Sequence, residues 1–138
     1  MINTHSFYSL RYGAMEPQAL LDLARQKGWN EMALTDINCT AGLIEFARVA
    51  PKFGVRPIAG VDFRNGIVQR YVAIAKNNEG FAQISEHLSM HLHDEKEFDV
   101  VAPAFSDVFV IYPFSVLSEE KRTPENFHLQ EHEFIGVA

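Results

Sequence analysis

Residues 54–66, GVRPIAGVDFRNG, combine a glycine stop, a short apolar run and a turn signal. The pattern from Pro57 to Phe63 predicts a β-strand that contains Asp62. The dipeptide Asn65-Gly66 that follows is the strongest short-range signal for a two-residue hairpin turn. We therefore expect residues 61–64 to fold back on residues 67–74 as an antiparallel pair.

Upstream of this hairpin, a helix followed by a strand is indicated. Leucine and alanine recur at helical spacing between Met15 and Lys27, and Pro17 suits the first turn of a helix there. Gly28 is the expected stop of this helix. The apolar run Met32–Thr35 that follows predicts a short strand, which ends at Asp36.

Two further helices are expected on either side of the hairpin. The second helix begins with Thr40 as its N-cap and ends at Gly54, and Pro51 near its end predicts that it is shortened. The third helix runs over residues 81–91, with Asn78 as its cap.

The rest of the chain is less regular. Residues 93–99 are polar and predict a loop, whereas Val108–Tyr112 predicts a buried strand. Residues 113–132 are irregular, and Phe134–Val137 predicts a last strand. Because the chain stops on an apolar strand, we expect it to be a fragment of a longer protein.

Strands that alternate with helices predict an α/β fold with parallel strands. The carboxyl ends of parallel strands lie on one side of the sheet, which is where active sites form in such folds. His5 follows a short predicted strand, Met1–Thr4, Asp36 ends the next strand, and Asp62 lies near the end of a third. These three side chains form a candidate metal site.

Composition limits the class of protein. The 138 residues carry a net charge of −6, so the chain lacks the basic footprint of a free-standing nucleic-acid binder. Cys39 is the single cysteine, which excludes an intramolecular disulfide and a cysteine-rich zinc site. A signal peptide and a membrane-spanning stretch are absent from the sequence, and we expect a cytoplasmic protein without a membrane partner.

Three stretches resemble the motifs of the PHP (polymerase and histidinol phosphatase) family. Asn3–Ser9, followed by Gly13, is similar to His-x-His-[Ser/Thr]-x-[Tyr/Phe]-Ser followed by Asp-Gly. Leu34–Asn38 resembles a motif built on Thr-Asp-His, and Gly54–Phe63 resembles Gly-[Ile/Val]-[Lys/Arg]-Pro-Ile-x-Gly-x-Glu-Phe. The order and spacing are most similar to the N-terminal domain of the alpha subunit of bacterial DNA polymerase III. The resemblance is dense over residues 1–92. Besides the three motifs, it includes matches at residues 41–46 and 75–81.

The resemblance implies a PHP-type distorted β/α barrel, here truncated to its N-terminal part. Residues 1–138 would form a single PHP-like domain at the start of a much longer polymerase chain. Active members of the family hold several zinc or manganese ions on His, Asp and Glu side chains and hydrolyse phosphoesters. In some alpha subunits the domain is a 3′-5′ exonuclease.

Carried over position by position, the metal site is mostly missing. Side chains that can bind a metal stand at three motif positions, which are His5, Asp36 and Asp62. Asp62 is one methylene shorter than the Glu of the family motif. Residues that supply no ligand stand at three others, which are Asn3, Tyr12 and Ile37. A divalent cation needs several anionic or imidazole donors, so the three retained side chains would form at best one mononuclear site.

We therefore expect a PHP-like domain with a degenerate metal site and a structural or subunit-docking role in DNA replication or error-prone repair synthesis. No cofactor is expected in the fragment, and magnesium would serve the parent DNA-directed DNA polymerase, a nucleotidyltransferase. Expected partners are the rest of the polymerase chain and a proofreading exonuclease subunit, with DNA bound through the parent chain only. The alternatives are an active phosphoesterase or 3′-5′ exonuclease with zinc or manganese, and a stand-alone interaction domain.

Other chemistry-bearing residues have simpler explanations. His87 and His91 are spaced i,i+4 and could bind zinc, but the same spacing is ordinary for a polar helix face. The interpretations of Cys39 as a nucleophile and of Arg11 as a phosphate ligand each depend on one residue without a supporting partner in the sequence. Trp29 follows a helix stop, which favours a packing role over base stacking.

Overall fold

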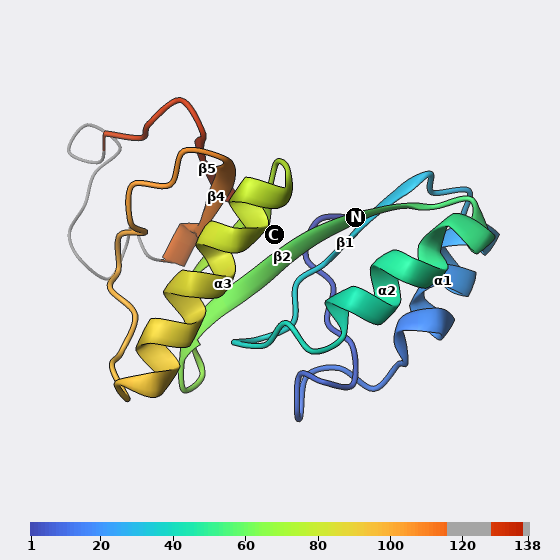
Figure 1. Ribbon diagram of the computed structural model, residues 1–138, viewed down its shortest axis with the longest axis horizontal. Helices are drawn as coiled ribbons and strands as arrows, with labels where there is room; N and C mark the ends of the chain where they lie inside the picture. Colours follow the sequence, from blue (N-terminus) through green and yellow to red (C-terminus); the bar gives the residue numbers. More distant parts are fainter. Residues whose placement is uncertain (116–127, 137–138) are drawn as a thin grey trace. The chain divides into compact units, whose positions relative to one another are not determined.

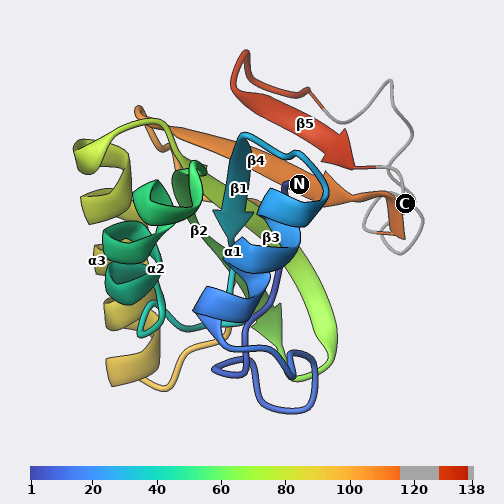
Figure 2. The same cartoon turned by 90° about the vertical axis from the view of Figure 1, so that its right-hand side faces the viewer.

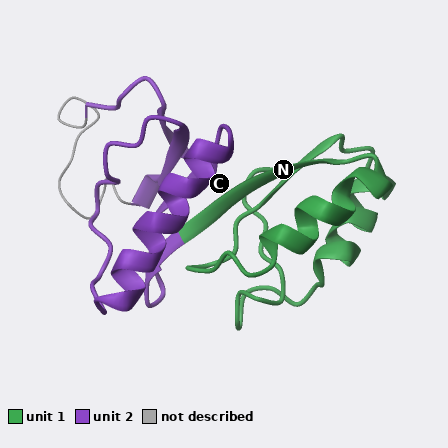
Figure 3. Ribbon diagram, viewed as in Figure 1, with its two compact units in different colours: residues 1–62 green, residues 63–138 purple. Residues whose placement is uncertain are grey.

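The structure is a computed structural model that describes residues 1–115 and 128–136. Its contacts divide the chain into two compact units, residues 1–62 and residues 63–138, which we call unit 1 and unit 2 (Figure 3). A single domain over residues 1–138 stays a prediction. The two units are described in turn.

Unit 1 contains a parallel strand pair and the helices that pack beside it (Figure 1). The strands β1 and β2 pair from Glu31 opposite Arg56 to Leu34 opposite Ala59. Helix α1 contacts α2, η1 and β1. The elements are α1 (Pro17–Gln26), β1 (Glu31–Leu34), α2 (Leu43–Val49), η1 (Ala50–Phe53) and the first part of β2 (Arg56–Asn65).

The helix boundaries of unit 1 follow from single residues. Pro17 opens α1 as predicted, because a proline in the first turn sacrifices no intrahelical hydrogen bond. The predicted cap of α2 was wrong: Gly42 is the N-cap, and Thr40 accepts the Leu43 N–H only through its backbone carbonyl. Pro51 lies where the α-helix gives way to η1, and Gly54 with a φ of 70° ends that turn.

The N-terminal segment lies along β1 without forming a regular strand. The backbone N–H groups of Ala33 and Thr35 donate to the carbonyls of Met1 and Thr4, respectively. The step of two residues from Ala33 to Thr35, just past the end of β1, is thus matched by a step of three residues from Met1 to Thr4, so the ladder is interrupted. The predicted strand Met1–Thr4 is therefore wrong, although the segment still places His5 at the end of β1.

Unit 2 contains the strands β3, β4 and β5 and one long helix. Strand β3 (Val68–Ala75) pairs antiparallel with β4 (Val108–Pro113), and β4 pairs parallel with β5 (Glu133–Gly136), as Figure 2 shows. Helix α3 (Asn78–His93) contacts β3 and β4. The predicted last strand is confirmed over Phe134–Gly136, and its Val137 lies outside the described residues.

The unit 2 sheet has one face under α3 and one face away from it. Tyr71 and Val110 lie on the α3 face, where Tyr71 reaches His87 of the helix. Residues on this face alternate with those on the other face, which carries Ile74 and Phe109 opposite each other. The fully buried aromatic and aliphatic residues of the α3 face form the core of unit 2; they include Phe63, Tyr71, Ala73, Ile84, Val108, Val110 and Tyr112.

The fold is α/β, as predicted, with the strand order β1-β2-β3-β4-β5. The pairs β1–β2 and β4–β5 are parallel, as expected, whereas β3, the return strand after the predicted Asn65-Gly66 turn, runs antiparallel to β4. In the described residues the strand order is open, with β1 and β5 as its ends. No helix in the described part of the chain is both long enough and apolar enough to span a membrane.

The cap of α3 generates the first testable prediction. The Asn77 side chain accepts the Gly80 N–H at 2.9 Å and donates to Asp107 at 2.8 Å, so Asn77 is the cap in place of the predicted Asn78. Asn77→Ala should lower the free energy of unfolding by about 1 kcal/mol, the usual cost of losing an N-cap. Urea unfolding followed by circular dichroism measures this change.

Asn78→Ala is the matched control, because Asn78 is the exposed neighbour of the same residue type. This variant should change stability by less than about 0.5 kcal/mol. Equal effects of the two substitutions would show that the capping contact does not stabilise α3.

Candidate functional site

A buried carboxylate at the end of β1 organises the candidate site. Asp36 is fully buried. Its Oδ1 accepts the Ser6 backbone N–H at 2.7 Å and the Ser9 hydroxyl at 2.6 Å, and its Oδ2 accepts the Ser6 hydroxyl at 2.6 Å. Hydrogen bonds to a charged acceptor are short and strong, so these contacts can offset the cost of burying the carboxylate.

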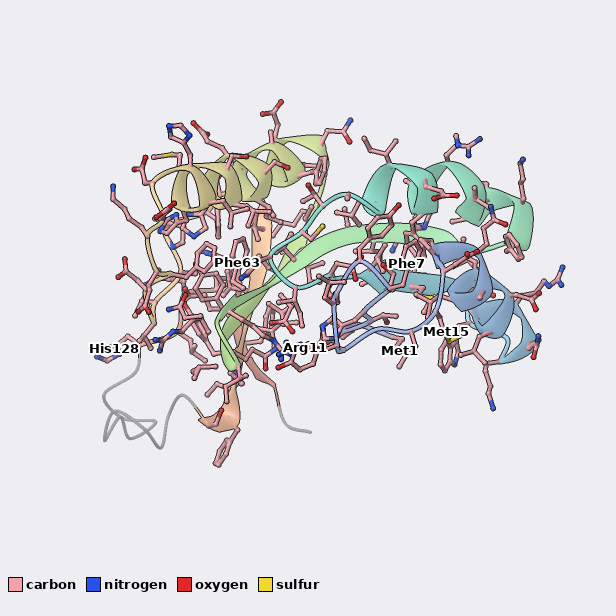
Figure 4. The ribbon with its side chains drawn as sticks, turned by 90° about the horizontal axis from the view of Figure 1, so that it is seen from below. Met1, Phe7, Arg11, Met15, Phe63 and His128 are labelled. Carbon is pink, nitrogen blue, oxygen red and sulfur yellow. The ribbon has the colours of Figure 1, made fainter. Side chains whose placement is uncertain are left out.

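The same serines extend the network into the backbone. The Ser9 Oγ accepts the Ile37 N–H at 2.9 Å, and the Ser6 Oγ accepts the Tyr8 N–H at 3.3 Å. The loop of residues 6–15, on which Phe7, Arg11 and Met15 are labelled in Figure 4, is thereby anchored to the end of β1. Asp36 thus joins two segments of the chain that are about thirty residues apart.

A second polar pair lies at the same strand ends. His5 Nε2 lies 3.0 Å from Asp62 Oδ2, and the Asp62 side chain is fully buried while that of His5 is 16% exposed. The backbone brings the carboxylate there, because the Asp62 N–H donates to the Asp36 carbonyl and the Asn38 N–H donates to the Asp62 carbonyl. The chain therefore contributes one imidazole and one carboxylate at this point.

Strand register separates the two carboxylates. An isolated parallel bridge joins Ile37 to Asp62, in the same register that joins Leu34 to Ala59. Asp62 therefore lies beside Ile37, one residue beyond Asp36, and successive residues of an extended strand point to opposite faces. His5 and Ser6 divide in the same way, since His5 contacts Asp62 whereas Ser6 contacts Asp36.

The motif positions that lack ligands are found on the His5 side of this arrangement. Ile37 is paired with Asp62, and the Tyr12 ring lies 6.5 Å from the His5 ring in an edge-on orientation. The side-chain Oδ1 of Asn3 accepts the Thr35 hydroxyl at 2.8 Å. Where the family motifs have histidine or aspartate, this chain has an alkyl group, a phenol and an amide.

These residues do not fit the metal centre that the family resemblance implies. Asp36 directs both oxygens at hydroxyl and N–H donors, and Ile37 supplies no donor atom. In the described residues, no group of three His, Cys, Asp and Glu side chains is arranged to hold a metal ion. The structure brings His5 and Asp62 together but does not bring Asp36 into the same set.

Sequence reasoning missed the two serines. They are part of the first motif, His5-Ser6-Phe7-Tyr8-Ser9, and a pair of hydroxyls three residues apart beside a buried acid was the available signal. Gly13 was quoted only as a motif residue. A Cβ at Gly13 would lie 1.9 Å from the Ser6 carbonyl oxygen, so the loop closes on Ser6 only with glycine there.

The histidine pair of unit 2 is part of an aromatic core. His87 Nε2 lies 2.7 Å from the Tyr71 hydroxyl, and His91 Nδ1 lies 2.9 Å from the His87 carbonyl. The two histidine rings are 4.3 Å apart, and Phe98 stacks on His91. Burial, and then the neighbouring His91, lower the pKa of His87 from 6.5 to about 4. Burial raises the pKa of Tyr71.

The remaining candidates occupy local structural positions. Cys39 accepts the Ala41 N–H at 3.4 Å within a turn. Arg11 is exposed on the N-terminal loop with a φ of 73° (Figure 4). The backbone N–H of Trp29 donates to the Ala24 carbonyl and closes the end of α1.

Comparison with known proteins identifies the family. The sequence profile of the PHP domain matches residues 2–118. The chain therefore belongs to the PHP domain family. It is 30% identical over 112 residues to the DNA polymerase III subunit alpha of Ureaplasma parvum, which covers 80% of this chain and 11% of that protein. It is 29% identical over 98 residues to the error-prone DNA polymerase of Mycobacterium tuberculosis, covering 64% of this chain and 9% of the relative.

Two solved structures share the fold. A provisionally assigned metal-dependent phosphoesterase from Bifidobacterium adolescentis has a TM-score of 0.53 at 23% identity, covering 67% of this chain and 31% of that one. An amidohydrolase from Chromobacterium violaceum, with bound sulfate and no metal, has a TM-score of 0.52 at 16% identity. That match covers 94% of this chain and 68% of the other. At these identities the likeness concerns the fold alone.

The Asp36 network predicts a large cost for a small change. Asp36→Asn replaces one acceptor oxygen with an N–H₂ group that faces donors, so at least one hydroxyl or N–H loses its partner. We expect the free energy of unfolding to fall by about 2–4 kcal/mol, from hydrogen bonds to a charged group worth about 1.5–3 kcal/mol each. Urea unfolding followed by the fluorescence of Trp29, the single tryptophan, measures the change in unit 1.

Asp22→Asn is the matched control for this substitution. The Asp22 carboxylate also accepts two side-chain hydrogen bonds, from Arg25 and Gln26, but it lies on the surface of α1. It should change stability by less than about 0.5 kcal/mol. A loss at Asp36 as small as this would contradict the anchoring role.

The buried His87 predicts a pH dependence of stability. Between pH 6.5 and about 4 the unfolded chain binds a proton at His87 that the folded chain does not bind. The contribution of His87 is therefore present above pH 6.5 and is lost as the pH falls towards 4. His87→Gln, whose carbonyl oxygen can still accept the Tyr71 hydroxyl, should flatten the slope of unfolding free energy against pH over this interval.

Urea unfolding by circular dichroism at pH 7, 6, 5 and 4 gives this slope. His93→Gln serves as the control, because His93 is exposed at the end of the same helix. The two variants should differ most between pH 6 and 4. Parallel slopes for both variants and the unmodified chain would refute the role of His87.

Proposed function

We propose that this chain is the N-terminal PHP domain of a bacterial DNA polymerase III alpha-type subunit, and that the domain is structural. Family membership and the polymerase relatives support the first part. The chain spans 8–12% of the length of the curated relatives it matches. Nucleotidyl transfer and its magnesium ions would belong to the rest of the polymerase, in replication or error-prone synthesis.

The observation that carries the structural role is the engagement of Asp36. A metal ligand must present a carboxylate lone pair to the ion, but three O–H and N–H groups surround this carboxylate. Releasing it for a metal would break the contacts that hold residues 6–9 on β1. The family's catalytic position is thus used here to hold the chain together.

The remaining donors support the same reading. A hydrolytic metal centre must lower the pKa of bound water substantially, which needs a firmly held cation with an open coordination position. His5 and Asp62 supply one imidazole and one carboxylate, already 3.0 Å from each other. Ile37 and Tyr12, at neighbouring motif positions, add neither an anionic nor an imidazole donor. We therefore infer a degenerate metal site.

A structural domain of this kind would act through its neighbours. Further chain would complete a PHP-type barrel beyond the open strand order of the described residues. The rest of the polymerase chain is the first partner, a docked proofreading exonuclease subunit is the second, and the bacterial cytoplasm is the expected location. The second candidate function is a metal-dependent phosphoesterase or 3′-5′ exonuclease, which the partly exposed His5 beside the buried Asp62 favours.

Metal content distinguishes the two candidate functions. The purified chain, without added metal or a histidine tag, should contain less than about 0.1 equivalents of zinc or manganese by elemental mass spectrometry. A variant with the family ligands restored, Asn3→His, Tyr12→Asp, Ile37→His and Asp62→Glu, should gain bound metal. Its gain would show that the missing donors, rather than the purification, explain the low content.

The contrary result is equally clear. About one equivalent of metal in the unmodified chain, lost in His5→Ala, would overturn the structural proposal. Hydrolysis of a generic phosphodiester such as bis-p-nitrophenyl phosphate, abolished by the same substitution, would then establish the phosphoesterase.

A further inference from the structure

Two histidines of α3 each keep one nitrogen that their hydrogen bonds do not use. His91 Nδ1 lies 2.9 Å from the His87 carbonyl oxygen. A carbonyl oxygen only accepts, so Nδ1 of His91 carries the hydrogen and Nε2 carries the lone pair. His87 Nε2 lies 2.7 Å from the Tyr71 hydroxyl, which leaves its Nδ1 unused. In the described residues neither remaining nitrogen has a hydrogen-bond partner, and neither is enclosed, so both are open to solvent.

The distance between the two rings matches that of two imidazoles on one metal ion. The ring centroids of His87 and His91 are 4.3 Å apart, with an interplanar angle of 61°. An imidazole nitrogen lies about 2.0–2.1 Å from its metal, which places the ring centre about 3.2 Å from the ion. Two such rings are then about 4.5 Å apart at a right angle around the metal and about 5.2 Å apart at a tetrahedral angle. The observed spacing favours the right angle of square-planar or tetragonal Cu(II) and Ni(II) over tetrahedral zinc.

Neighbouring groups hold both rings in position. Phe98 stacks on His91 with the centroids 4.8 Å apart, and Phe105 contacts the His87 ring edge-on at 5.7 Å. A hydrogen bond at the second ring nitrogen, to a backbone carbonyl or another polar group, is typical of metal-binding histidines because it sets the tautomer and the orientation of the ring. With a metal ion on Nδ1, His87 carries its hydrogen on Nε2 and donates it to the Tyr71 oxygen. The existing hydrogen bonds therefore persist when an ion binds.

The charge of unit 2 favours a cation at this pair. Residues 63–138 contain six Lys and Arg against twelve Asp and Glu, a net charge of −6. Burial and the neighbouring His91 lower the pKa of His87 to about 4, and the carboxylate of Asp99 opposes this shift. At neutral pH His87 is therefore uncharged, and no proton competes with a metal ion for its lone pair. His91 lies in the last turn of α3, at the negative end of the helix dipole.

We propose that His87 Nδ1 and His91 Nε2 chelate one divalent transition-metal ion, Cu(II) or Ni(II) in preference to zinc. In the part of the chain that the structure describes, no group of three His, Cys, Asp and Glu side chains is arranged to hold an ion. The two imidazoles are therefore the protein ligands, and water occupies the remaining coordination positions. The ion links two successive turns of α3. A site with only two protein ligands exchanges its metal readily, so added metal is needed to detect it.

The helix, rather than the spacing in the sequence, makes this pair a chelate. His128 and His132 are also four residues apart, but residues 128–132 form no helix. On a helix, residues four apart lie on the same face, one turn from each other. The site is also separate from the family position in unit 1, where His5 contacts Asp62. This inference therefore goes beyond the proposed structural role and does not depend on it.

Isothermal titration calorimetry with nickel chloride, on the untagged 138-residue chain stripped of metal by EDTA and dialysed, tests the proposal. We expect one ion per chain, and His91→Ala and His87→Gln should each weaken the affinity at least about tenfold. Electron paramagnetic resonance of the Cu(II) complex should show an axial signal with coupling to two nitrogens. Circular dichroism checks that each variant is folded, and the partly exposed His91 provides the test where His87→Gln is not.

Three histidines outside the pair provide matched controls. His93→Ala removes an exposed histidine two residues beyond His91, on another side of the helix. His128→Ala breaks the second pair with the same spacing, and His5→Ala removes the family position in unit 1. Each of these variants should bind nickel with the affinity of the unmodified chain.

Four results would overturn the proposal. They are nickel binding that His91→Ala leaves intact, several ions bound per chain with similar affinity, a copper signal coupled to a single nitrogen, and an equal loss of affinity in His93→Ala. The structural role of unit 1 depends instead on zinc or manganese content and on His5. The two proposals can therefore fail separately.

Discussion

A carboxylate cannot be left without partners in the interior of a protein, and the first half of this molecule is arranged around that constraint. Asp36 is fully buried at the end of β1, and its oxygens accept two serine hydroxyls and one backbone N–H. An unpaired buried charge would be far more costly than any one of these contacts is favourable. The loop of residues 6–15 therefore has to stay on the strand end, and with it His5 stays beside Asp62.

Much of this arrangement was predictable from the sequence, and the errors have physical causes. The hairpin after residues 61–64, the strand Val108–Tyr112 and the convergence of His5 with Asp62 follow from turn chemistry and strand order. The direction of β3 relative to β4 does not follow from the sequence, because apolar runs look alike in parallel and antiparallel strands. The separation of Asp36 from Asp62 depends on register, and a shift of one residue reverses the face of every side chain.

The separation of the two carboxylates also shows how a family motif could persist without metal binding, as the proposed degenerate site requires. Ser6 and Asp36 satisfy each other on one face of the strand ends, while His5, Ile37 and Asp62 lie on the other. A replacement such as isoleucine at position 37 removes a donor from the second face without disturbing the hydrogen bonds of the first. Under the proposed degenerate site, stability and metal binding would rest on different side chains of the same motifs, so the residues that hold the fold could remain after the ligands were replaced.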